Sequence, residues 1–178
     1  MYDNWPYAEI IQEARCGFYF WRNWRTVEQH NEVLLLWQDF TGECHIKCYV
    51  SQSNQSEIIK DEIISTDFLH QFLDIAQRNG ILDLSSQLTA RSSSHGDDYV
   101  GIKTVDAVTN SYIVKAMRHD DSRHEAIVLL SYAISPELVT YYGLSLQGVR
   151  KRLRQIFNAS GISISPLLIE SVTISDRQ

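Results

Sequence analysis

The alternation of apolar and polar residues is most regular from Ser65 to Leu84, STDFLHQFLDIAQRNGILDL. Apolar residues recur there at the i, i+3, i+4 spacing of a helix that lies on a core. Ser65 and Thr66 offer N-cap oxygens, and Asn79-Gly80 is typical of a helix end. The segment therefore predicts a capped amphipathic helix whose apolar arc consists of Phe68, Leu69, Phe72, Leu73, Ile75 and Ala76.

Strand patterns precede this helix. Glu43 to Val50 alternates strictly, which places Cys44, Ile46, Cys48 and Val50 on one face and Glu43, His45, Lys47 and Tyr49 on the other. Within Glu32 to Gln38 the run VLLLW is apolar on both faces and suits a central strand, so the two segments predict a hairpin. Ile58 to Ile64 predicts a further strand, and Tyr7 to Arg15 predicts a short helix.

The remainder of the chain continues with strands and then helices. Ser85 to Asp98 is polar and serine-rich, which predicts a loop. Cap residues at Ser122 and Ser135-Pro136 predict two helix starts. The other expected elements are a second hairpin from Tyr99 to Val105 and Ser111 to Met117, a helix from Leu144 to Phe157, and a terminal strand from Leu167 to Ile174.

These elements define an expected fold. We predict an α+β protein in which residues 1–178 form a single domain. Its antiparallel sheet would contain the two hairpins plus additional strands, with amphipathic helices packed mainly on one face.

Composition narrows the expected setting. The chain of 178 residues has a net charge of −6, which argues against a general nucleic-acid binder. Its three cysteines are an odd number and form no disulfide framework, so we expect a reducing compartment. The N-terminus lacks the pattern of a signal peptide, and no apolar run is long enough to span a membrane. A soluble cytoplasmic protein is the expectation.

All four tryptophans lie in the first quarter of the chain, at positions 5, 21, 24 and 37. One interpretation is a core or sheet-face cluster. A second is a partner-binding surface centred on Trp21 and Trp24, because tryptophan is enriched at binding hot spots. A third, a stacking platform for nucleic acid, has only three arginines beside the rings.

Two groups of polar residues raise the question of metal or catalytic chemistry. Cys44-His45-x-x-Cys48 suggests zinc, but on a strand His45 points away from both sulfurs and no second ligand pair exists. His95, Asp97, His119 and Asp121 flank the second hairpin and supply an alternative function, a small hydrolase-type enzyme that is possibly metal-dependent. No catalytic motif supports it. We therefore predict no catalytic residue, no cofactor and no metal.

One basic run stands out, GVRKRLRQ from Gly148 to Gln155. On a helix, Arg150, Lys151 and Arg154 share one exposed flank, while Arg152 lies on the opposite one. The run is either a solvated helix face or a docking site for an acidic protein surface.

The whole pattern favours a non-catalytic protein-interaction module, such as an inhibitor, an immunity factor or an adaptor. The order of hairpin, DFLxxFLDIA helix, polar loop, second hairpin and helix from Glu32 to Ser135 resembles emfourin, a family of small protein inhibitors of metalloproteases. The glycine-rich start of that family is reduced here to Thr41-Gly42-Glu43. The resemblance is one of pattern, and it carries over no functional residue.

Overall fold

The computed structural model describes residues 6–25, 29–53, 55–78, 97–103, 113–117, 122–159 and 161. Contacts divide the chain into two compact units. The first comprises Met1–Leu69 and Leu84–Arg118, and the second comprises His70–Asp83 and His119–Gln178.

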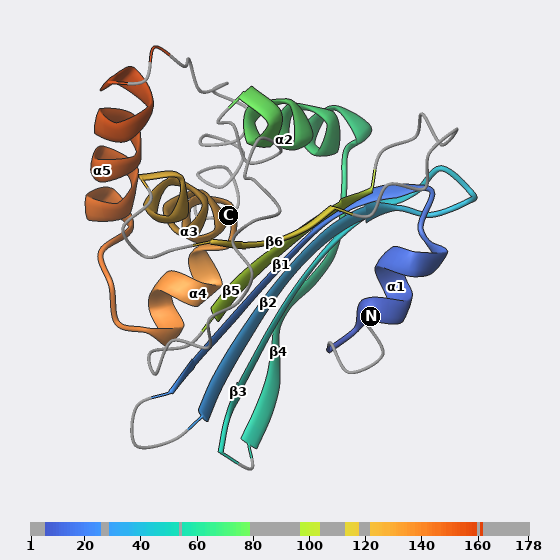
Figure 1. The fold of residues 1–178 in the computed structure, drawn as a ribbon, viewed down its shortest axis with the longest axis horizontal. Helices are drawn as coiled ribbons and strands as arrows, with labels where there is room; N and C mark the ends of the chain where they lie inside the picture. Colours follow the sequence, from blue (N-terminus) through green and yellow to red (C-terminus); the bar gives the residue numbers. More distant parts are fainter. Residues whose placement is uncertain are drawn as a thin grey trace, which may run out of the picture. The chain divides into compact units, whose positions relative to one another are not determined.

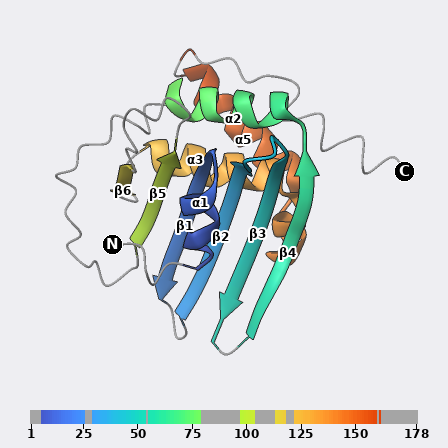
Figure 2. The ribbon, with the colours of Figure 1, turned by 90° about the vertical axis from the view of Figure 1, so that its right-hand side faces the viewer.

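The first unit contains a six-stranded sheet (Figure 1), whose strands follow the order β4-β3-β2-β1-β5-β6 (Figure 2). All neighbouring strands pair antiparallel. Among the described residues, β4 is therefore one edge of the sheet. The strands are β1 (Cys16–Arg25), β2 (Gln29–Gln38), β3 (Cys44–Gln52), β4 (Gln55–Ile64), β5 (Asp97–Lys103) and β6 (Ile113–Met117).

Strand position explains the apolar patterns. The four consecutive residues Val33 to Leu36 of β2 are fully buried, because this strand is inside the sheet and both of its faces are covered. On β3 buried and half-buried residues alternate, with Cys44, Ile46, Cys48 and Val50 buried. The hairpin predicted from Glu32 to Val50 is thus confirmed.

A short helix, α1 (Ala8–Glu13), covers β1 and β2 on the face of the sheet opposite to the side chains of Cys44 and Cys48 (Figure 2). Its Ile11, together with Ala14, packs into a cluster with Tyr19, Val33 and Leu35. The Tyr19 hydroxyl donates a hydrogen bond of 2.6 Å to the Pro6 carbonyl, which ties the start of the helix to the sheet. We call this side of the sheet the α1 face.

The predicted amphipathic helix is α2 (Thr66–Arg78). Ser65 caps it, since its Oγ accepts a hydrogen bond of 3.1 Å from the Phe68 backbone N–H. The expected apolar arc is the buried face, with Phe68, Leu69, Phe72, Ile75 and Ala76 all buried.

Three further helices, α3 (Ser122–Ile134), α4 (Pro136–Tyr141) and α5 (Leu146–Ala159), belong to the second unit, where α3 contacts both α4 and α5. Pro136 occupies the first turn of α4, and Gly143 follows its end at a φ of 66°, as the sequence predicts. On α5 the apolar stripe Val149, Leu153 and Phe157 is buried.

The α+β class is confirmed. The single domain and the placement of helices mainly on one face stay predictions. The polar loop before Asp97 and the expected strand from Leu167 to Ile174 lie outside the described residues. Within the described part of the chain, no helix combines the length and apolar character needed to cross a membrane.

Candidate functional site

The turn between β2 and β3 is built around one carboxylate. Asp39 Oδ1 accepts hydrogen bonds from the Thr41 backbone N–H at 2.9 Å, the Thr41 hydroxyl at 2.6 Å and the Glu43 backbone N–H at 3.0 Å. Gly42 closes the turn at a φ of 93°, a conformation that favours glycine. These bonds leave the second oxygen, Oδ2, for other partners.

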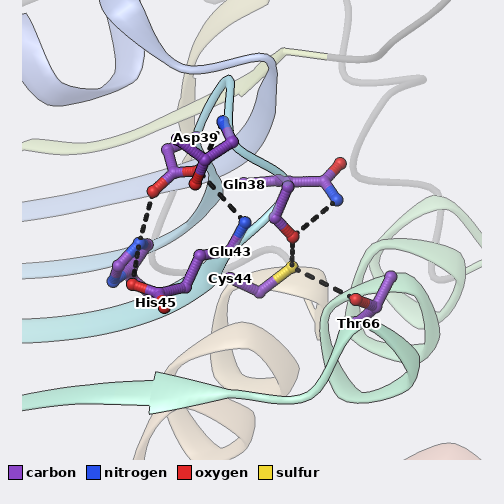
Figure 3. Close-up of polar contacts among 8 residues, drawn as sticks. Gln38, Asp39, Glu43, Cys44, His45 and Thr66 are labelled. Carbon is purple, nitrogen blue, oxygen red and sulfur yellow. Dashed lines mark hydrogen bonds and ion pairs between the residues drawn. The ribbon is translucent and has the colours of Figure 1, made fainter.

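That oxygen faces an imidazole (Figure 3). His45 Nε2 lies 2.9 Å from Asp39 Oδ2 and 3.5 Å from Glu43 Oε1. The ring of His45 also stacks on Trp37, with centroids 4.9 Å apart and planes inclined by 17°. One donor atom from each of Asp39, Glu43 and His45 lies within 4.8 Å of the other two. We call these three residues the turn triad.

Hydrogen bonding holds Asp39 in its ionised form. Its pKa is lowered from 3.8 to about 2, first by the Thr41 hydroxyl and then by His45, with smaller contributions from the backbone N–H groups of Glu43 and Thr41. The carboxylate is therefore charged throughout the physiological pH range.

A shift in the pairing register of β3 and β4, close to the triad, changes which residues of β4 lie on the α1 face. His45 pairs with Ile63 and Lys47 with Asp61. The register then shifts between Cys48 and Tyr49, so that Tyr49 pairs with Ile58. Residues directly opposite each other share a face of the sheet. Ile58, Asp61 and Ile63 consequently all lie on the α1 face, although Ile58 and Ile63 are five positions apart.

Three large apolar side chains are exposed in this region. Ile63 is 67% exposed and Ile58 is 48% exposed, while Phe40 in the adjacent turn is 77% exposed. Asp61 lies between Ile58 and Ile63 on β4, and Asp39 and Glu43 belong to the same turn as Phe40. We call Phe40, Ile58 and Ile63, with these three carboxylates, the edge surface.

Acidic groups also surround Tyr7 at the start of α1. Its ring makes an edge contact with Tyr49 at 5.0 Å, and the Lys47 ammonium lies 4.7 Å above it. Burial raises the pKa of Tyr7, as do the nearby groups of Tyr49, Glu9 and Asp61. The Lys47 ammonium is also 3.6 Å from Asp61, so it contacts both this carboxylate and the Tyr7 ring.

Trp21 lies beside the buried cluster of Ile11, Ala14, Tyr19, Val33 and Leu35. It is half-buried and packs against the α1 cluster, as does Trp37. Its indole N–H donates a hydrogen bond of 3.2 Å to Asn31 Oδ1. The Trp24 side chain lies outside the described residues. The partner-binding role expected for Trp21 and Trp24 stays a prediction.

The basic flank of α5 lies on a helix, as expected, but its residues differ in exposure. Lys151 and Arg154 are exposed, whereas Arg150 is half-buried and already engaged in an interaction. Arg152, on the opposite flank, binds Glu125 of α3 through two hydrogen bonds of 2.8 and 3.2 Å. The structure thus leaves Lys151 and Arg154 as the accessible cations of the flank.

Two further groups of candidate residues came from the sequence, the Cys44-His45-x-x-Cys48 motif and the group of His95, Asp97, His119 and Asp121. Cys44 and Cys48 are buried on the face opposite His45, and the Cys44 thiol contacts Thr66 Oγ1 at 3.8 Å (Figure 3). The expected placement of His45 on the face opposite both sulfurs is therefore confirmed. His95, His119, Asp121 and the side chain of Asp97 lie outside the described residues.

The turn triad is absent from the sequence-based candidates. A signal for it exists, because the alternation of β3 places Glu43 and His45 on one face, directly after the Asp39 turn. What the pattern lacks is the turn conformation that brings Asp39 back over His45.

Comparison of the chain with protein-family models, curated proteins and solved structures found no match. The resemblance to emfourin gains no support from these comparisons.

Proposed function

We propose that the protein is a non-catalytic interaction module, an inhibitor, immunity factor or adaptor, that binds a protein partner through the edge surface. The observation that carries this proposal is the exposure of Ile58 and Ile63 on the edge strand β4, together with that of Phe40 in the β2–β3 turn. Exposed apolar side chains grouped with polar neighbours are typical of interaction sites.

The chemistry of the edge surface defines the partner. Asp39, Glu43 and Asp61 make the rim acidic, and Lys47 and His45 offset only part of that charge. A complementary segment would present apolar side chains to Ile58 and Ile63, and lysine or arginine to the carboxylates. We therefore infer a partner segment that is both apolar and basic.

The exposed edge strand suits such a segment. An extended peptide can add to a sheet edge through main-chain hydrogen bonds, while pockets select its alternate side chains. The register shift in β4 limits regular pairing at its centre, so side-chain contacts on the α1 face would contribute much of the specificity.

A second contact surface would be the α5 flank with Arg150, Lys151 and Arg154. The exposure of Lys151 and Arg154 supports docking of an acidic protein surface there. The location we propose is the cytoplasm, because Cys16, Cys44 and Cys48 are all buried thiols rather than disulfides.

Capture from an extract of the native cells tests the edge surface. The wild type should retain a partner from the extract. The variants Ile63→Asp and Phe40→Asp should each bind this partner with at least about tenfold lower affinity, since each change places a charge in an apolar contact. Leu144→Asp is the matched control, because Leu144 is 48% exposed in the second unit.

The affinities would be measured by calorimetry with the purified partner at two salt concentrations. Equal affinity of the wild type and both edge-surface variants would exclude this surface. Circular dichroism of every variant establishes that lost binding is not lost folding.

A further inference from the structure

The turn triad combines two kinds of metal ligand. Asp39 and Glu43 offer carboxylate oxygens and His45 offers an imidazole nitrogen, all within 4.8 Å of one another. This mixture of oxygen and nitrogen donors suits first-row divalent ions, whereas Mg²⁺ and Ca²⁺ prefer oxygen alone.

The distances match the coordination shell of zinc. In a tetrahedral site with bonds of about 2.0–2.2 Å, neighbouring ligand atoms lie about 3.3–3.6 Å apart. His45 Nε2 is 3.5 Å from Glu43 Oε1 and 2.9 Å from Asp39 Oδ2. The first distance already matches this spacing, and the second must grow by about half an ångström to admit an ion.

We propose that Asp39 Oδ2, Glu43 Oε1 and His45 Nε2 form a three-ligand site for a divalent transition-metal ion of the Zn²⁺ class, with the fourth position open to water. This site goes beyond the protein-binding function, which requires no metal. Two carboxylates and a neutral imidazole also give the site the negative charge that a dication requires.

The surrounding contacts hold the ligands in place. Three hydrogen bonds fix Asp39 Oδ1, so that Oδ2 remains directed at His45. Stacking on Trp37 fixes the plane of the imidazole ring. Such contacts orient metal ligands and commonly change affinity by 10–100-fold when removed.

Binding requires one rearrangement of a proton. A proton shared by His45 Nε2 and Asp39 Oδ2 must leave that position, because the nitrogen lone pair then binds the ion. It moves to Nδ1 in a neutral ring and is released to water from a protonated one. The buried thiols of Cys44 and Cys48 lie on the opposite face and take no part.

Titration of the EDTA-treated protein with Zn²⁺ alone tests the proposal. We expect the wild type to bind Zn²⁺, and we expect its affinity for Zn²⁺ to fall at least tenfold in His45→Gln and in Glu43→Gln. His70→Gln is the matched control, since it removes an exposed histidine from α2. Thr41→Val, which removes the hydroxyl bond to Asp39, should weaken binding by about tenfold.

Imidazole NMR of the unmodified protein provides a readout that does not depend on variants. Zn²⁺ should shift the Nε2 resonance of His45, and Co²⁺ should give the visible absorption of low coordination number. An unchanged His45 resonance at saturating Zn²⁺, or equal affinity in the wild type and both ligand variants, would overturn the site and leave the triad as a hydrogen-bonded turn. Partner binding through Phe40 and Ile63 would stand in either case.

Discussion

The ring of Trp37 on β2 stacks on the ring of His45 on β3, and the two residues are register partners in the sheet. A cross-strand pair of this kind stabilises the hairpin and limits rotation of the imidazole. The imidazole of His45 also hydrogen-bonds with Asp39 Oδ2, so this ring links strand β3 to the turn that precedes it.

The first prediction concerns acid stability. The folded-state pKa of Asp39, about 2, lies below its ordinary value of 3.8. Its contribution to stability is therefore complete above about pH 4 and is lost as the pH falls from 3.8 toward 2. In metal-free buffer, Asp39→Asn should unfold at lower urea concentration near neutral pH and should lose less stability over that acidic range.

Carboxyl NMR checks the assignment directly. Thr41→Val removes the largest cause of the shift, so the Asp39 carboxyl of this variant should titrate closer to 3.8 than that of the wild type. Titration of the wild-type carboxyl at its ordinary value would refute the prediction.

The second prediction concerns the contact of α1 with the sheet. A Cβ at Gly17 would lie 2.5 Å from Ile11 Cδ1 and 2.6 Å from the Leu36 carbonyl oxygen. That oxygen belongs to the backbone of β2, so it cannot move without disturbing the ladder. Gly17→Ala should lower the free energy of unfolding by about 1–3 kcal/mol, as overpacked core sites do.

Gly148 gives a control of opposite sign. It lies in α5, and an added Cβ would meet nothing closer than Ser145 Cβ at 3.5 Å. Gly148→Ala should therefore raise stability by about 0.5–1 kcal/mol through helix propensity. Urea denaturation measures both variants, and equal stability of Gly17→Ala and wild type would contradict the packing argument.

The third prediction concerns the basic flank of α5. Arg150→Glu/Arg154→Glu should fold normally and bind a polyglutamate probe more weakly at low salt than the wild type. The comparison variant is Arg152→Glu, which makes the same type of charge change on the opposite flank, at a residue that pairs with Glu125. An oligonucleotide bound through three phosphate contacts would show a log–log salt slope of only about −2 to −3. Unchanged polyglutamate affinity in the double variant would identify the flank as solvated surface.

Local patterns explain how much of the fold the sequence predicts. The alternation of β3 and the apolar arc of α2 each depend on residues close in sequence, and both agree with the observed burial. The pairing of β1 with β5 depends on contacts between distant segments, which no local pattern encodes.

The candidate site was less predictable for the same reason. Simple alternation would place Ile58 and Ile63 on opposite faces, whereas the register shift places both on the α1 face. Likewise, the approach of Asp39 to His45 depends on the turn conformation. The tryptophans were ambiguous because the same rings suit a core and a binding surface, and Trp21 and Trp37 are half-buried against the cluster under α1.

The three buried thiols give the sheet a built-in reporter. Cys16 lies on β1, and Cys44 and Cys48 lie on β3, all with almost no accessible surface. An alkylating reagent reacts with an exposed thiolate, so modification must wait until the strands separate. Alkylation followed by mass spectrometry would thus time the opening of two separate strands in native buffer, in a protein that needs no engineered label.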